Sequence, residues 1–167
     1  MNIQIVNEKD ELIGFKPRGE VNSQADIYRA AGLWVTNSLG EVLIAQRKFT
    51  KANDPGKWGP AVAGTVEVGE TYEANIYKEA EEEIGLTGVV FAVATKQRVT
   101  HPRNYFCQWY TATLDRDLAD FVIQNEEVEQ IKWISKEALI DDLQANPNAY
   151  TATMPKLLKQ FTAKCEL

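Results

Sequence analysis

The chain has 167 residues, of which 44% are hydrophobic and 25% charged, a composition typical of a globular domain with a sizeable core. Its net charge of −6 and pI of about 4.9 argue against a non-specific nucleic-acid or anionic-membrane binder, because such a protein needs a basic surface. The apolar runs are too short for a membrane span and the N-terminal residues show no signal peptide, so we expect a single cytoplasmic domain over residues 1–167.

Short strands separated by turns dominate the first part of the chain. Apolar and β-branched runs bounded by Asn, Asp, Gly and Pro predict strands at residues 3–6, 11–16, 27–36, 41–47 and 61–64. The first two strands form a predicted N-terminal β-hairpin over residues 1–18. Residues 48–60 are rich in Lys, Asn, Pro and Gly and therefore predict a loop.

A helix is predicted after this strand region. Thr71 is a suitable N-cap, the helix runs to about Ile84, and Gly85 is placed to end it as a C′ glycine. Its predicted buried stripe consists of Ala74, Ile76, Tyr77, Ala80 and Ile84. The same register leaves three glutamates facing a cleft, Glu79, Glu82 and Glu83.

The second half of the chain predicts further strands and then helices. The strands are expected at residues 89–96, 105–114 and 129–134, and the helices at 136–145 and 155–164. Ser135 caps the first of these helices, and Asn146 with Pro147 ends it. The order strands, helix, strands, helices predicts an α+β fold, with C-terminal helices over residues 136–167 packed on a mixed sheet.

Cysteine and histidine are too scarce for several common kinds of site. Cys107 lies in an apolar strand pattern, which predicts a free buried thiol, and Cys165 is too distant in sequence to suggest a disulfide scaffold. His101 is the only histidine, so the chain cannot easily supply a structural zinc site. No G-x-S-x-G motif accompanies it to indicate a serine nucleophile.

The glutamates of the predicted helix stand at helical spacing. Glu79, Glu82 and Glu83 occupy positions i, i+3 and i+4, which places their carboxylates on one face about 5–6 Å apart, where like charges repel. A hard cation among them relieves this repulsion, and Mg²⁺ takes oxygen ligands while keeping room for waters and substrate phosphates. The pattern favours a carboxylate-only Mg²⁺ site. The alternative is a solvated acidic face, in which Lys78 pairs with Glu82 at i+4.

A wider spacing surrounds these glutamates. Residues 64–86, GTVEVGETYEANIYKEAEEEIGL, resemble the Nudix box: a glycine, five residues, Glu, seven residues, Arg-Glu, an apolar residue, any residue, Glu-Glu, any residue, Gly and an apolar residue. The matching positions are Gly64, Glu70, Glu79, Glu82, Glu83, Gly85 and Leu86. Ala80 matches weakly, and Lys78 replaces the Arg. The resemblance implies a Nudix-type α/β/α sandwich and hydrolysis of a nucleoside diphosphate linked to another group, X.

The resemblance also implies roles for single residues. The metal, Mg²⁺ or Mn²⁺, would be held by Glu79, Glu82 and Glu83 with help from the carbonyl of Gly64. Glu70 would orient the basic residue of the box rather than bind the metal. That basic residue is Lys78, which keeps the charge of arginine but lacks its bidentate fork.

The reaction implied is cleavage of a diphosphate bond by a metal-activated water. Phosphoryl transfer needs mainly positioning and charge stabilisation, so no protein nucleophile is required. Several Nudix hydrolases take a general base from a glutamate before a late strand that contains a Trp, and Glu127, six residues before Trp133, is similar. An equally good interpretation makes Glu126, Glu127 and Glu129 exposed loop residues.

Several basic and aromatic residues are weaker candidates. Phosphate contacts could come from Arg29, Arg47 and residues 98–103, and base stacking from Tyr28, Tyr105 and Trp109. Aromatic residues at period two in strands are more often part of the core, so no site role is assigned to them.

Residues 5–134 also resemble the branch of Nudix proteins related to isopentenyl diphosphate isomerase. Those enzymes carry a catalytic Cys before the box glycine, where this chain has Ala63, and histidine ligands where it has Tyr28 and Thr65. Isomerase activity is therefore the alternative function, beside a non-catalytic Nudix-fold binding module. The substrate stays open among small-molecule diphosphates, as does the oligomeric state, for which a symmetric homodimer is the commonest choice.

Overall fold

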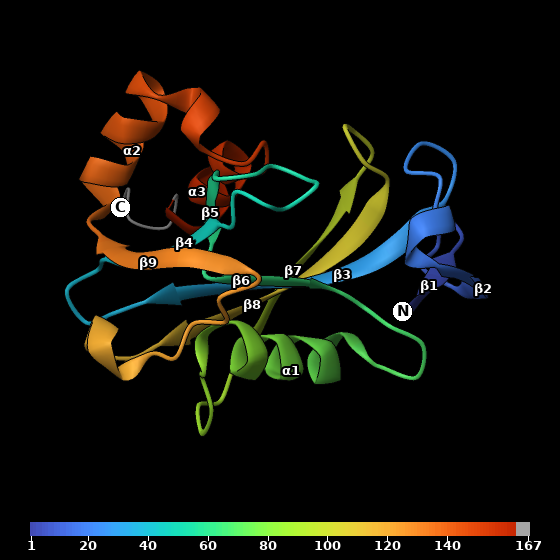
Figure 1. Ribbon diagram of the computed structural model, residues 1–167, viewed down its shortest axis with the longest axis horizontal. Coiled ribbons are helices and arrows are strands. Elements are labelled where there is room, and N and C mark those ends of the chain that lie inside the picture. The colour runs from blue at the N-terminus through green and yellow to red at the C-terminus, as the bar shows by residue number, and fades with distance from the viewer. Residues whose placement is uncertain (163–167) are drawn as a thin grey trace.

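The computed structural model describes residues 1–162, in which nine strands form one mixed sheet with helices on both sides (Figure 1). The strands are β1 (Asn2–Val6), β2 (Leu12–Pro17), β3 (Ile27–Thr36), β4 (Val42–Arg47), β5 (Trp58–Pro60), β6 (Val62–Thr65), β7 (Ala92–Val99), β8 (Tyr105–Thr113) and β9 (Val128–Ile134). The helices are α1 (Tyr72–Ile84), α2 (Lys136–Ala145) and α3 (Met154–Thr162), with short 3₁₀ turns at Arg18–Glu20, Leu118–Asp120 and Pro147–Ala149. None of these helices is long and apolar enough to cross a membrane.

Strand β3 lies at the centre of the sheet. It pairs in parallel with β8 and antiparallel with β1, β4 and β6, while β4 also pairs with β5 and β9, and β7 with β8. The predicted mixed sheet and α+β class are therefore confirmed. We call residues 64–86 the acidic segment. Because β6 leads directly into α1, the pairing of β6 with β3 brings the start of this segment against the middle of the sheet.

The two faces of β3 belong to two different cores. Ala31, Leu33 and Val35 are fully buried in the cluster that contains the apolar side chains of α1. Trp34 points to the other face and packs in the cluster with Met154 and Leu157 of α3. Figure 1 shows the result, with α1 on one side of the sheet and α2 and α3 on the other.

Helix α1 begins and ends as its sequence predicts. The Thr71 side chain accepts a hydrogen bond from the Ala74 N–H, and Gly85 has a φ of 64°, the left-handed conformation that favours glycine at C′. Ile76, Ala80 and Ile84 are buried as expected, and Tyr77 is half-buried.

One predicted core position of this helix is wrong. Ala74 is exposed, and the neighbouring Asn75 is fully buried instead. The helix is turned so that Asn75 reaches the end of β6, where its amide donates a hydrogen bond to the Thr65 carbonyl at 3.0 Å. A polar residue can thus be buried in a helix when the adjoining strand supplies its hydrogen-bond partner, even beside an alanine that the apolar pattern predicts to be buried.

Other differences from prediction lie at element boundaries. The predicted loop 48–60 ends in strand β5, which the pairing of Trp58–Pro60 with β4 creates. The strand expected at 89–96 begins at Ala92, because only from that residue does β7 pair with β8. The last helix begins at Met154, and its predicted end at residue 164 lies outside the described residues, as does Cys165. Cys107 is free and buried, as predicted.

Candidate active site

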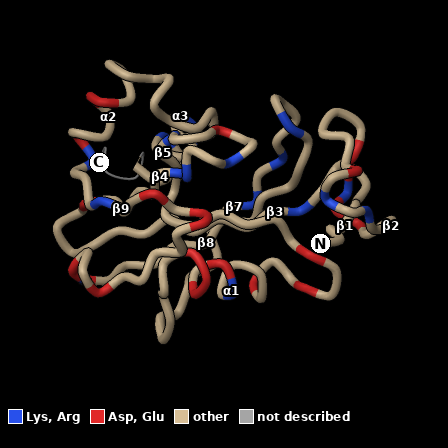
Figure 2. Tube along the Cα trace, in the orientation of Figure 1, with Lys and Arg blue, Asp and Glu red and all other residues tan. Residues whose placement is uncertain are grey.

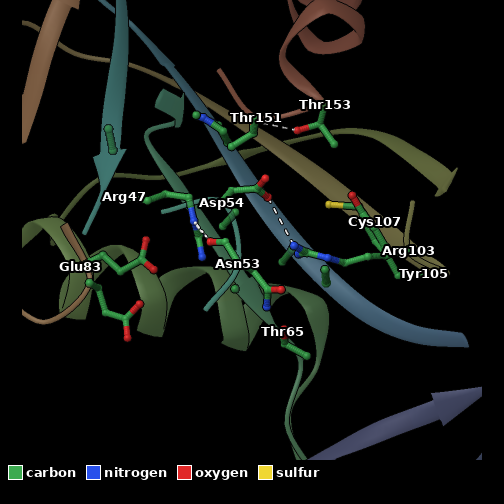
Figure 3. Close-up of a pocket in the computed structure, with 18 of the residues that line it drawn as sticks. Arg47, Asn53, Asp54, Thr65, Glu83, Arg103, Tyr105, Cys107, Thr151 and Thr153 are labelled. Carbon is green, nitrogen blue, oxygen red and sulfur yellow. Dashed lines mark hydrogen bonds and ion pairs between the residues drawn. The ribbon is translucent and has the colours of Figure 1, made fainter. Parts of the chain in front are cut away.

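A cleft of about 250 Å³ opens between the sheet and the loops that carry residues 53–54, 102–103 and 151–153. Strands β3, β4, β6 and β8 supply its floor. Glu83 of α1 lies toward one end, and Arg103 and Tyr105 lie toward the other (Figure 3). The cleft therefore has an acidic end next to the glutamate helix and a second end that is basic and aromatic.

The junction of β6 and α1 brings a glycine and a carboxylate into close contact. A Cβ atom added to Gly64 would lie 2.3 Å from Cγ and 2.7 Å from Oε1 of Glu79. No side chain fits there, so only glycine allows the Glu79 carboxylate to lie against the backbone of β6. This is a physical reason for the glycine that opens the acidic segment.

Two of the glutamates lie in an environment that disfavours their charge. Burial, and then the charges of Glu79 and Glu127, raises the pKa of Glu83 to about 8. Burial also raises the pKa of Glu79 to about 6, with Lys78 opposing the rise and Glu82 adding to it. A positive ion placed among these groups would favour their ionised forms.

The arrangement fits a divalent cation in its chemistry. The oxygen atoms of the predicted ligands are of the kind that Mg²⁺ prefers, and Gly64 lets the Glu79 carboxylate lie against the strand. Within residues 1–162, no three Asp, Glu, His or Cys side chains lie in an arrangement that can hold an ion as they stand. Glu83 faces the cleft and Glu79 adjoins Gly64, whereas Glu82 is exposed on the helix surface. Ligation by all three requires a change of side-chain rotamer, which an exposed residue makes on a picosecond to nanosecond scale.

Glu127 comes to the cleft from the turn before β9. It lines the cleft together with Glu83, and it is ion-paired with Lys51. The neighbouring Glu126 is exposed, and Glu129 pairs with Lys48 at 2.9 Å, away from the cleft lining. Figure 2 shows this acidic turn next to the acidic residues of α1. Of the three loop glutamates, Glu127 is thus the one that the fold brings to the site.

Glu70 and Lys78 form an ion pair beside the acidic cluster. The Lys78 Nζ lies 2.6 Å from Glu70 Oε1 and 2.8 Å from Glu67 Oε1, but 3.9 Å from Glu79 Oε1. Burial lowers the pKa of Lys78, and the two close carboxylates more than reverse this, so its pKa is raised and its charge retained. Lys78 does not pair with Glu82, which was the alternative surface interpretation.

The other end of the cleft contains several of the weaker candidates. Tyr28 and Tyr105 are partners in the β3–β8 register and stack with ring centroids 5.3 Å apart. Both line the cleft, as does Arg103, whereas Arg47 lines it near Glu83 (Figure 3). Two other arginines do not: Arg29 binds Asp10 and Arg98 binds Glu8, and both belong to the attachment of the N-terminal hairpin.

Some lining residues carry no recognisable sequence signal. They come from loops and one 3₁₀ turn and were not predicted: Arg18, Asn53, Asp54, Thr151 and Thr153. Only the fold brings them together, because they lie far apart in the chain.

A family model for the NUDIX domain matches residues 27–158. The chain belongs to the Nudix family. A Nudix hydrolase of Pseudomonas aeruginosa is 30% identical over 143 residues, which cover 85% of this chain and 83% of the relative. The Nudix hydrolase YfcD of Escherichia coli is 30% identical over 142 residues, covering 82% of this chain and 75% of the relative. The protein is accordingly a hydrolase of the Nudix family, which cleaves nucleoside diphosphate-linked compounds.

Solved structures show the same fold. The crystal structure of DR0079 from Deinococcus radiodurans aligns over 100% of both chains with a TM-score of 0.84 at 22% identity. The NUDIX domain of NrtR from Shewanella oneidensis, complexed with ADP ribose, aligns over 90% of this chain and 94% of that chain, with a TM-score of 0.63 at 16% identity. The predicted Nudix-type sandwich is confirmed.

Proposed function

We propose that this Nudix hydrolase is Mg²⁺-dependent and cleaves the diphosphate bond of a nucleoside diphosphate linked to X, or of a similar small molecule. One observation carries the proposal. The acidic face of α1 meets the cleft where Glu83 and Glu127 approach each other, and Gly64 lets the Glu79 carboxylate lie against the strand.

Each residue of this face has a role in the proposal. Glu79, Glu82 and Glu83 would hold Mg²⁺, or Mn²⁺ in its place, together with the carbonyl of Gly64. When bound, the ion neutralises diphosphate oxygens and lowers the pKa of a water molecule. Glu127, which lines the cleft and is ion-paired with Lys51, would accept the proton of the attacking water.

The basic end of the cleft supports an anionic substrate. Arg103 lines this end, ion-paired with Asp54 at 3.3 Å, and Arg47 lines the cleft nearer to Glu83; a guanidinium group presents a planar fork that matches phosphate oxygens. The stacked pair of Tyr28 and Tyr105 adds an apolar aromatic surface beside them. This combination suits a substrate that has a charged diphosphate and a planar or apolar group.

Isomerase chemistry is not favoured by the same cleft. Ala63, where the isomerases have cysteine, lines the cleft, and so do Tyr28 and Thr65, where they have histidine. Among the described lining residues there is no histidine. A binding module without activity would have no use for Glu127 beside the acidic face, so hydrolysis is the function that we propose.

A substrate panel tests the proposal. Purified protein would be incubated with ADP-ribose, diadenosine tetraphosphate, coenzyme A, nucleoside triphosphates and isopentenyl diphosphate, with Mg²⁺, Mn²⁺ or EDTA. Metal-dependent release of a nucleotide, phosphate or pyrophosphate would support hydrolysis. Conversion of isopentenyl diphosphate to its isomer would identify the alternative enzyme. Binding of panel members without any turnover would identify a module and contradict the proposal.

A further inference from the structure

The buried amide of Asn75 connects the two carboxylates on which the acidic segment depends. Its side chain is 0% exposed, and Nδ2 lies 2.9 Å from Glu70 Oε2, 3.0 Å from the Thr65 carbonyl and 3.4 Å from Glu79 Oε1. All three neighbours only accept hydrogen bonds, so chemistry decides that the amide nitrogen, not the oxygen, faces them. Asn75 is therefore a donor to the acidic cluster.

The two oxygens of Glu70 have different partners. Oε1 is 2.6 Å from the Lys78 ammonium, while Oε2 accepts from Asn75 and from the Glu67 backbone N–H at 3.0 Å. Lysine is a point donor that reaches only Oε1 here, whereas an arginine fork can engage both oxygens of a carboxylate. Asn75 and Lys78 stand at i and i+3 of α1 and thus share one face of the helix.

A cost accompanies this arrangement. Asn75 Oδ1 is the one buried side-chain oxygen or nitrogen in residues 1–162 without a hydrogen-bond partner in the protein. A buried carbonyl without a donor destabilises the folded state. An apolar residue at this position would avoid that cost and favour the helix more strongly. What the asparagine adds is its pair of N–H donors.

We propose that Asn75 is a positioning residue. Asn75 and Lys78 divide between them the contacts to Glu70 that a single arginine would make at position 78 of the Nudix box. Lys78 supplies the charge and binds Oε1 of Glu70, and Asn75 supplies the second hydrogen-bond donor and binds Oε2. The same amide has a longer contact of 3.4 Å with Glu79 Oε1, which can only share a hydrogen with the two closer acceptors, so its main effect is on Glu70 and it adjoins the proposed metal-binding carboxylate. The inference rests on the proposed function for its activity readout, but its metal-binding readout is independent of turnover.

A double-mutant cycle of Asn75→Ala and Lys78→Arg tests this division. Asn75→Ala should lower kcat by about tenfold or more, with a smaller change in KM, because one hydrogen bond to a charged carboxylate is lost. Lys78→Arg should recover most of the loss in the Asn75→Ala background, because the fork then reaches both oxygens of Glu70. The gain from arginine should be clearly larger in that background than in the wild type.

The second readout is the Mg²⁺ concentration that gives half of the thermal stabilisation. Asn75→Ala should raise this midpoint, and the added Lys78→Arg should lower it again. Gln108→Ala is the matched control, since Gln108 is a buried amide that bonds only backbone carbonyls, those of Ala94 and Trp109. It should lower the melting temperature without moving the Mg²⁺ midpoint.

Several outcomes would overturn the inference. If Asn75→Ala kept its rate and its Mg²⁺ midpoint, Asn75 would have no positioning role. If it lost both and arginine at position 78 restored neither, Asn75 would act only through packing. If Asn75→Ala fails to fold, Asn75→Ser takes its place in the cycle, and Lys78→Arg is expected to recover its rate and its Mg²⁺ midpoint in the same way. A wild type that is stabilised by Mg²⁺ but hydrolyses nothing in the panel would contradict the proposed function. The Mg²⁺ midpoints of the wild type and the Asn75 and Lys78 variants would still decide the role of Asn75.

Discussion

The acidic residues around the cleft differ in what holds them. Glu70 pairs with Lys78, and Glu127 with Lys51, so each has a cation of its own. Glu83 instead is half-buried in the cleft near other carboxylates, and its desolvation and these charges raise its pKa. The paired residues are suited to orienting a neighbour or accepting a proton. A residue like Glu83 gains most from a bound divalent ion, because a hydrogen bond from the Ala63 backbone and the charge of Arg47 do not outweigh the burial and the like charges that disfavour its ionised form.

Lys78→Arg should keep or raise the rate of hydrolysis. The lysine already pairs with Glu67 and Glu70 at 2.8 and 2.6 Å, so arginine would retain the charge and add a bidentate fork. Steady-state kinetics on any substrate that the panel identifies would measure the change. Lys78→Gln, which removes the charge, is the comparison and should lose activity. A large fall in rate for the arginine variant with unchanged folding would show that lysine has a role of its own.

Ala63→Cys should not create isomerase activity. The new thiol would lie in the cleft, but Tyr28 and Thr65 also line it, and the resemblance to the isomerases predicts that they stand where those enzymes have histidine ligands. Without those ligands and their acid–base partners, a thiol alone cannot carry the proton transfers. Incubation of the variant with isopentenyl diphosphate, followed by product analysis, provides the measurement. Detectable isomer above the wild-type level would reverse the argument against the alternative function.

At the scale of elements, one turn residue of the N-terminal hairpin contacts three other elements, in addition to the pairing of β1 with β3. Asp10 has a φ of 61°, and its side chain is 11% exposed. The carboxylate accepts hydrogen bonds from Arg29 of β3 at 2.7 Å, Lys96 of β7 at 2.6 Å and Tyr72 of α1 at 2.9 Å. One residue thereby joins the hairpin to three other elements.

Asp10→Asn should destabilise the protein by about 1–2 kcal/mol at pH 7, because two cations lose their charged partner. Asparagine also tolerates a positive φ, so backbone strain does not confuse the result. Urea unfolding would measure the difference. Glu8→Gln is the control on the same hairpin: Glu8 is 73% exposed in its pair with Arg98 and should contribute little. Equal effects of the two changes would contradict the special role of Asp10.

The effect of Asp10→Asn should also depend on pH. Burial raises the pKa of Asp10, but the bonds from Lys96, Arg29 and Tyr72 outweigh this and hold it below the ordinary value. A carboxyl with a lowered pKa in the folded state stabilises the protein fully above its unfolded pKa of about 3.9, and loses that contribution as pH falls through the folded pKa. The difference in the free energy of unfolding between wild type and variant should therefore be constant from pH 5 to 8 and shrink below about pH 4.

Local sequence signals predicted the elements well where the cause was local. The cap at Thr71 and the glycine at Gly85 set the ends of α1, and the apolar run 27–36 became β3 without change. Strand β5 was missed because three residues of Trp-Gly-Pro become a strand only by pairing with β4. Asn75 was missed because its burial depends on acceptors in β6 and on Glu70, which helical periodicity does not reveal.

For the molecule as a whole, the Nudix box could be found in the sequence but the cleft could not. The box is one continuous stretch of the chain, so the fixed spacing of its residues can be recognised directly in the sequence. Arg47, Arg103, Glu127 and Thr151 reach the cleft from four separate parts of the chain, and only the pairing around β3 and β4 brings them together. The glutamates of the box were therefore predictable as a group, although Glu82 is exposed and not in the cleft lining. Arg47, Arg103 and Glu127 were candidates in the sequence, but their approach to one cleft depended on long-range pairing.

If the acidic face binds Mg²⁺, the whole fold should respond to the ion. Ligand binding to the folded state alone adds about 2.7 kcal/mol at 100 times Kd, which is roughly 5–10 °C in Tm for a chain of this size. Melting curves over a range of Mg²⁺ concentrations would show a Tm that rises with concentration. A Tm indifferent to both Mg²⁺ and Mn²⁺ would count against the site.

Glu83→Gln should have opposite effects on metal-free stability and on function. Without metal, the variant should be at least as stable as the wild type, by a few tenths of a kcal/mol, and the difference should grow as pH rises toward about 8, because the charged form of Glu83 is disfavoured by burial and by Glu79 and Glu127. With Mg²⁺, its stabilisation should shrink and most hydrolysis should be lost, because an amide binds a hard cation less well than a carboxylate. Glu81→Gln is the matched control, since Glu81 is exposed on the same helix and lies outside the proposed ligand set. If Glu83→Gln behaved like Glu81→Gln, with full Mg²⁺ stabilisation and full activity, α1 would carry only a solvated acidic face.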